Sequence, residues 1–169
     1  MKKIVTFLLL TLSLITLSQA AGENITMKSV KGQVLHASKT EKGLLFDELK
    51  GKVLFVEIYG HRCPHCIKAI DPYNALQEKY KEKLAIVSIE VGGYNEAQLK
   101  KFDDLYGIEY INLSQKEAAW LVPYVSQVGG YRGMIPFLAI FDKNGNFYKS
   151  FSGPVPKQEL EKIIAELSK

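Results

Sequence analysis

Two cysteines are the residues of this sequence whose type and spacing best suit chemistry. Cys63 and Cys66 are the only cysteines among 169 residues, and Pro64 and His65 separate them. A disulfide over so short a loop restricts the unfolded chain very little, which disfavours a purely structural role. Two thiols at this spacing can instead cycle between a dithiol and a disulfide. The pattern therefore predicts a redox-active pair.

The residues after Cys63 predict that the pair lies at the start of a helix. Apolar residues recur at three- and four-residue intervals to about Lys83, with a kink expected at Pro72. Because unpaired amides in the first helical turn stabilise an anion, we expect the pKa of the Cys63 thiol to be lowered. A thiolate attacks disulfides and is a good leaving group. We therefore predict that Cys63 is the nucleophile and Cys66 the resolving thiol.

Strands and helices that position this pair alternate along the chain. A loose alternation at 25–38 predicts a short, weakly held hairpin, and 44–49 is read as one helical turn. The alternation of predicted strands and helices, with a hairpin near the C-terminus, indicates a mixed sheet covered by helices on both faces. Buried strands are predicted at 52–59, 84–91, 108–113 and 134–141, a hairpin strand at 147–152, and further helices at 95–106, 114–120 and 156–167. In the helix at 95–106 the inner face is predicted to be Leu99, Phe102 and Tyr106.

The N-terminus predicts export. Lys2 and Lys3 precede an apolar run at 4–17, and small residues at 18 and 20 complete a signal peptide over 1–20. That run is about 14 residues, too short to cross a bilayer, so we expect a protein of the bacterial periplasm. Removing the two lysines lowers the formal net charge from +4 to +2, too little to indicate a nucleic acid partner. We assign 21–28 to an N-terminal tail and 29–169 to one domain, expected to be a monomer.

The motif Cys63-Pro64-His65-Cys66, after a buried strand and at a helix start, resembles the active site of the thioredoxin superfamily. That resemblance implies an α/β, thioredoxin-like fold with a central mixed sheet flanked by helices. The dipeptide Pro64-His65 is the one found in DsbA-type periplasmic disulfide oxidases. In that family a histidine at the position of His65 favours the reduced pair, because its partly positive ring stabilises the thiolate. The dipeptide therefore implies an oxidising protein.

Two more features resemble the superfamily. Glu57 lies six residues before Cys63, where these proteins keep a buried acidic residue beneath the pair. Burial raises the pKa of a carboxyl group, so Glu57 is expected to exchange a proton with Cys66. Ile135-Pro136 is similar to the cis-proline segment, which would lie beside the disulfide and offer the backbone of Ile135 to an extended substrate. The alternatives are a salt-bridged Glu57 at a sheet edge and an ordinary trans Pro136.

The number of residues between the motif and Pro136 resembles that of a different branch of the superfamily. From Cys66 to Pro136 is 70 residues, more than in a minimal thioredoxin and fewer than in a DsbA-type protein with its helical domain. It is similar to the TlpA and ResA group of thiol reductases, which carry an extra helix and strand. We therefore expect an inserted helix and strand before Pro136. One departure is Arg62, which replaces the tryptophan that most thioredoxin-like proteins carry before the first cysteine.

These resemblances predict thiol-disulfide exchange on the thiols or disulfides of exported proteins, with a membrane redox partner that recycles the pair. The oxidising direction is favoured because the dipeptide touches the sulfur that sets the potential. The alternative is a reducing protein that serves cytochrome c maturation. No organic cofactor or metal is expected, since the electrons rest on the two sulfurs.

Two other interpretations of the motif remain open. His61, Cys63, His65 and Cys66 offer soft ligands for copper or zinc, which would suit a metallochaperone. An inert disulfide is the second. His61 is otherwise expected to be a solvated loop residue.

Overall fold

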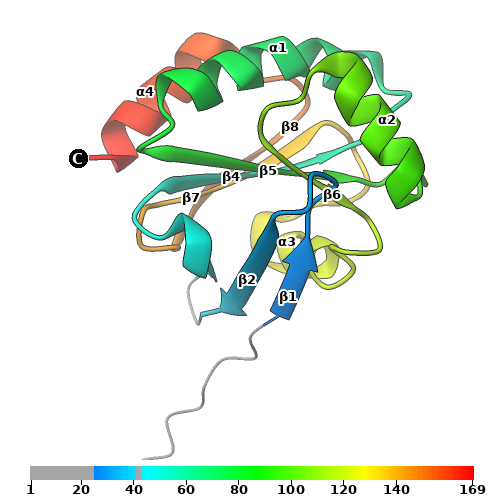
Figure 1. Ribbon diagram of the computed structural model, residues 1–169. Coiled ribbons are helices and arrows are strands. Elements are labelled where there is room, and N and C mark those ends of the chain that lie inside the picture. Colours follow the sequence, from blue (N-terminus) through cyan, green and yellow to red (C-terminus); the bar gives the residue numbers. More distant parts are fainter. Residues whose placement is uncertain (1–24, 41–42) are drawn as a thin grey trace, which may run out of the picture.

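The computed structural model describes residues 25–40 and 43–169 (Figure 1). The predicted signal peptide, residues 1–20, lies outside this part of the chain. Within the described residues no helix is long and apolar enough to span a membrane.

A five-stranded mixed sheet forms the centre of the molecule, with the strand order β6-β5-β4-β7-β8. Strands β4, β5 and β6 run parallel to one another, whereas β7 is antiparallel to both β4 and β8. Every residue of β4, β5 and β7 is buried, as expected for central strands without alternating polarity. The bounds are β4 Val53–Tyr59, β5 Leu84–Glu90, β6 Ile111–Ser114, β7 Phe137–Phe141 and β8 Phe147–Ser152.

Helices cover both faces of this sheet, as the sequence predicts. Figure 1 shows α1 (Pro64–Lys79), α2 (Glu96–Tyr106) and α4 (Lys157–Leu167) over one face. The other face carries α3 (Leu121–Gly129) and the N-terminal strands. Each face has its own hydrophobic core. The unit α2–β6 lies between α1 and Pro136, which confirms the predicted inserted helix and strand.

The N-terminal strands form a second, antiparallel sheet of β1 (Ile25–Lys28), β2 (Val34–Lys39) and β3 (Leu44–Phe46). The predicted hairpin is confirmed, but the assignment of 21–28 to a tail is corrected for the residues of β1. Met27 in β1 is buried against the core, so this segment belongs to the domain. The helical turn predicted at 44–49 is also wrong for its first half, because Leu44 and Phe46 point inward from β3 and only 47–49 forms a 3-10 helix.

Other elements begin later than the sequence predicts. The third strand of the parallel set starts at residue 111, and the strand predicted at 134–141 starts only after Pro136, which has no amide hydrogen to donate. The helix predicted at 114–120 is absent. Helix α3 instead spans 121–129, with Pro123 in its first turn, where proline is tolerated.

Helix α2 has the predicted ends but a different buried face. Asn95 caps it through a hydrogen bond from the backbone N–H of Gln98, and Gly107 ends it in a left-handed conformation with φ 59°. Tyr106 is 37% exposed rather than internal. Asp103 is buried in its place because it accepts a hydrogen bond from Asn112 and pairs with a lysine.

Candidate redox site

The two cysteines form a disulfide at the N-terminus of α1, directly after the turn that follows β4. Their Cα atoms are 5.2 Å apart. Cys63 is the N-cap of α1, and the backbone N–H of Cys66 donates to its Sγ over 3.2 Å. Pro64 occupies the first helical position, where its missing N–H has no cost. This geometry gives the Cys63 sulfur the oriented amide expected to favour a thiolate.

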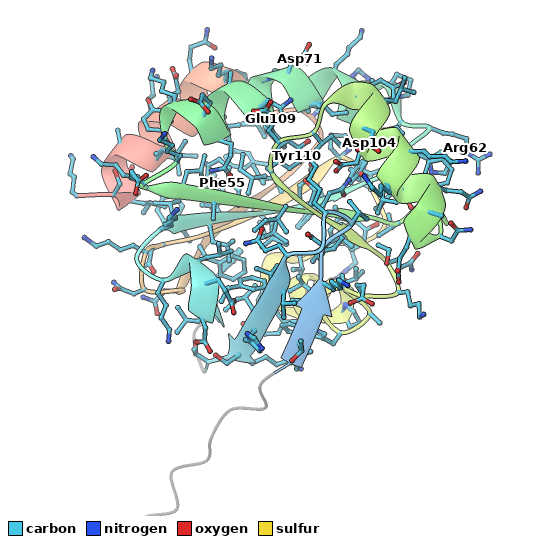
Figure 2. All side chains as sticks on the ribbon, in the orientation of Figure 1. Phe55, Arg62, Asp71, Asp104, Glu109 and Tyr110 are labelled. Atoms are coloured by element: carbon cyan, nitrogen blue, oxygen red, sulfur yellow. A yellow bond between two sulfur atoms is a disulfide. The ribbon has the colours of Figure 1, made fainter. Side chains whose placement is uncertain are left out.

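The two sulfurs differ in access. Cys66 is 1% exposed and belongs to the core under α1, whereas Cys63 is partly exposed. Pro64, His65 and Arg62 are more exposed than Cys66 and lie around Cys63 in the sequence. Figure 2 shows Arg62 at the right-hand edge of the view, away from the buried Phe55. Only Cys63 is therefore placed to meet a sulfur from another protein.

Glu57 lies in the middle of β4 and is 2% exposed. Its neighbours two positions away, Phe55 and Tyr59, belong to the same core as Cys66, so strand alternation puts Glu57 on the α1 side of the sheet. The hydroxyl of Ser88 donates to its Oε2 over 2.6 Å. Burial raises the pKa of Glu57 to about 7, and the Ser88 hydrogen bond opposes the shift only partly.

The salt-bridged alternative for Glu57 is wrong. Its strand, β4, lies between β5 and β7, so Glu57 is not at a sheet edge. Among the ion pairs within 25–40 and 43–169, none includes Glu57. No cation among these residues therefore neutralises the carboxyl group, which agrees with the raised pKa of Glu57.

The Ile135–Pro136 peptide bond is cis, as expected, and lies against the disulfide. The carbonyl oxygen of Ile135 is 3.9 Å from Cys63 Sγ. Gly60 makes room for this segment, because a Cβ on Gly60 would lie 2.9 Å from Ile135 Cδ1. Cys63 and Ile135, 72 positions apart in the sequence, thus meet where the family resemblance implies that a substrate backbone binds.

The expectation for His61 is wrong. Its side chain is 9% exposed, and its Nδ1–H donates to Glu90 Oε1 over 2.8 Å. The ring stacks on Tyr94, with centroids 3.6 Å apart. His61 is partly buried rather than solvated, because Glu90, at the end of the neighbouring strand, supplies a partner for its polar edge. Sequence reasoning missed Glu90 and Tyr94, although a carboxylate at the end of an apolar run was a signal.

Comparisons with solved structures show the fold. A thioredoxin-family thiol:disulfide interchange protein from Chlorobium tepidum TLS superposes with a TM-score of 0.69, at 20% identity, over 86% of this chain and 94% of that one. StoA from Bacillus subtilis superposes with a TM-score of 0.63 at 14% identity, and the match covers 85% of this chain and 97% of StoA. A putative thiol:disulfide interchange protein DsbE from Chlorobium tepidum superposes with a TM-score of 0.66 at 17% identity, and the match covers 88% of this chain and 95% of that one. This chain has a thioredoxin-like fold.

Sequence relatives of this thioredoxin-like chain are thiol-disulfide oxidoreductases by name. The thiol-disulfide oxidoreductase ResA of Bacillus thuringiensis (strain Al Hakam) is 28% identical over 132 residues, which covers 75% of this chain and 70% of the relative. The ResA of Bacillus anthracis has the same identity, 28% over 132 residues, and the same coverage. No protein-family profile matches the sequence.

The metal-binding alternative finds no support in the geometry of the thioredoxin-like site. His65 is exposed, the Nδ1 of His61 bonds to Glu90, and the two sulfurs bond to each other. In the part of the chain that the structure describes, no three His, Cys, Asp or Glu side chains are grouped as metal ligands. In this disulfide form the four residues of that hypothesis are therefore not grouped as metal ligands.

Proposed function

We propose that this protein catalyses thiol-disulfide exchange on exported proteins, in the reducing direction. The observation that carries the proposal is the Cys63–Cys66 disulfide at the N-terminus of α1, with Cys63 accessible and Cys66 buried. A helix N-terminus stabilises the thiolate that attacks disulfides. The similarity to ResA proteins over three quarters of the chain supports the same chemistry.

The direction rests on a choice between two resemblances. The Pro64-His65 dipeptide favours oxidation, but His65 is exposed, and among the hydrogen bonds of the described residues none joins its ring to Cys63. The ResA relatives and the StoA and DsbE structures instead support the reducing alternative, to which the insertion before Pro136 also points. We therefore replace the oxidising direction with the reducing one.

The exchange proceeds in two steps. The Cys63 thiolate attacks a substrate disulfide, which forms a mixed disulfide and releases one substrate sulfur as a thiolate. The Cys66 thiol then loses its proton, and its thiolate attacks Cys63 Sγ. This attack releases the second substrate sulfur and forms the Cys63–Cys66 disulfide, so two electrons pass to the substrate. A membrane redox partner that supplies two electrons would restore the dithiol.

Glu57 is the group that we assign to the proton of Cys66. It lies on the same side of the sheet as Cys66, and burial holds its pKa at about 7. A carboxyl group with this pKa accepts and returns a proton near neutral pH, as a general base requires. The substrate backbone would lie along Ile135, whose carbonyl is already beside Cys63 Sγ.

A redox titration of the purified domain against glutathione tests the proposed direction. We expect a reduction potential near about −270 mV, the value of a reducing thioredoxin, and a potential above about −150 mV would instead indicate an oxidase. A protein whose cysteines fail to equilibrate with glutathione would contradict the exchange function itself.

A further inference from the structure

Glu90 ties the turn before Cys63 to the loop after β5. Its carboxylate is fully buried at the end of β5. Oε1 accepts the His61 Nδ1–H over 2.8 Å and the Gly92 N–H over 2.6 Å, while Oε2 accepts the Tyr94 N–H over 3.0 Å. The backbone N–H of His61 adds a longer bond of 3.3 Å to Oε1. One side chain thus accepts hydrogen bonds from two segments, the turn at 60–63 that carries Cys63 and the loop at 92–94.

The surroundings hold the His61 ring in one orientation. It stacks on Tyr94 with only 10° between the ring planes. A Cβ on Gly92 would lie 2.5 Å from Glu90 Oε1 and 2.7 Å from His61 Nδ1. The loop therefore needs a glycine at this position to leave room for the His61–Glu90 hydrogen bond.

The position of Cys63 depends on this turn. Cys63 follows His61 by two residues, and its N–H donates to the carbonyl of Gly60 over 3.0 Å, which closes the turn around His61. The sulfur must stay within reach of the Cys66 N–H and beside the Ile135 carbonyl. A shift of the turn would change both contacts, and with them the stability of the thiolate.

We propose that His61 and Glu90 are positioning residues for the nucleophile Cys63. Their hydrogen bond fixes the 60–63 turn and so aims Sγ at the amides of the first turn of α1. This role rests on the proposed exchange function, to which it adds two residues that do not touch the substrate. Weakening the bond should lower the reactivity of Cys63 without removing either sulfur.

The chain offers a matched control pair. His36 in β2 also donates through Nδ1 to a glutamate, Glu48, and that carboxylate also accepts the backbone N–H of His36. This second pair is more exposed and lies in the N-terminal part of the fold, away from the cysteines. Substitutions there test the loss of a His–Glu bond alone.

The experiment compares His61→Phe, Glu90→Gln and their double variant with His36→Phe and Glu48→Gln. Phenylalanine can still stack on Tyr94, so His61→Phe removes mainly the ring hydrogen bond. Glutamine keeps the size of Glu90 but leaves a single acceptor oxygen for the N–H groups that the two carboxylate oxygens accept. Two quantities are measured on the reduced, folded proteins: the alkylation rate of Cys63 with iodoacetamide at pH 7, and the equilibrium constant with glutathione. Circular dichroism and the thermal midpoint monitor folding.

We expect each single variant at the site to lower the alkylation rate by up to about fivefold, the factor that one hydrogen bond typically carries. The glutathione equilibrium should shift by a similar factor toward the disulfide, because a less stable thiolate disfavours the reduced form. The double variant should lose no more than the more severe single one, since both remove the same bond. The control variants should match the wild type in both quantities.

A lower thermal midpoint with unchanged alkylation and glutathione equilibrium would show a purely structural role and overturn the inference. If Glu90→Gln does not fold, the alkylation rate and the glutathione equilibrium of His61→Phe decide whether the inference holds. A wild-type protein that does not exchange with glutathione would overturn the proposed function instead. The alkylation rates would still decide whether His61 and Glu90 position Cys63.

Discussion

Cys63 and Cys66 differ in exposure although they share one disulfide, and this difference predicts different variants. Cys63→Ser should abolish exchange, because the accessible nucleophile is gone. Cys66→Ser should retain attack but not resolution, so a mixed disulfide with glutathione should accumulate on Cys63. Mass spectrometry of both variants after incubation with oxidised glutathione measures this. A stable adduct on Cys66 in the Cys63→Ser variant, and none on Cys63 in the other, would reverse the two roles.

Glu57 predicts a pH-dependent stability. Burial raises its pKa from 4.5 to about 7 in the folded protein, so the folded state binds more protons than the unfolded one between these values. The contribution of this protonated carboxyl group is present below about 4.5 and is lost as the pH rises through about 7. Glu57→Gln does not titrate, so its stability relative to the wild type should increase between about pH 4 and pH 9, on the order of 3 kcal/mol.

Urea denaturation of the wild type and Glu57→Gln across this pH range measures the difference. Subtracting the two curves removes the groups that titrate equally in both proteins. A difference that stays flat with pH would mean that Glu57 has an ordinary pKa in the folded state. The proton transfer to and from Cys66 would then lose its basis.

At the scale of single residues, local spacing predicted part of the site. Cys63, Cys66 and Glu57 lie on one strand and the helix that follows it, so their relation is set by short-range geometry. The position of Glu57 beneath the pair and the contact of Ile135 with the Cys63 sulfur were predicted from the resemblance to the thioredoxin superfamily. The His61–Glu90 bond depends on the parallel register that pairs Tyr59 with Glu90, which no local pattern reveals.

Among the elements, α2 carries the clearest local signals. Asn95 and Gln98 form a capping box, in which each side chain accepts a backbone N–H of the other residue. Asn95→Ala should therefore destabilise the protein by about 1 kcal/mol, with little effect on the glutathione equilibrium. Chemical denaturation measures the destabilisation, and a redox titration measures the glutathione equilibrium. An unchanged denaturation midpoint would mean that the cap contributes nothing to the fold.

Elements without such signals are harder to predict. Strand β3 falls within a segment whose sequence favours a helical turn. Residues 44–46 are extended because they pair with β2, a contact that the local sequence does not reveal. The apolar spacing at 114–120 likewise predicts a helix, whereas the structure ends β6 at Ser114, has turns at 115–120 and begins α3 at Leu121. Tertiary contacts decide these segments, and a single sequence does not display them.

For the whole molecule, the alternation of apolar runs is enough to predict a mixed sheet covered on both faces. The order of the strands in that sheet does not follow from the sequence, since it depends on crossover connections rather than on local pattern. The direction of exchange is likewise a property of the whole domain. It reflects everything that stabilises the dithiol relative to the disulfide, whereas Pro64-His65 is only one contribution.

We expect the start of α1 to make the sulfur of Cys63 an unusually stable anion. The most direct test is the alkylation rate of Cys63 in the reduced protein as a function of pH, with mass spectrometry to assign the modified cysteine. We expect the rate to reach half its plateau well below about pH 8.5, where a free cysteine titrates. A half-plateau near that value would contradict the account.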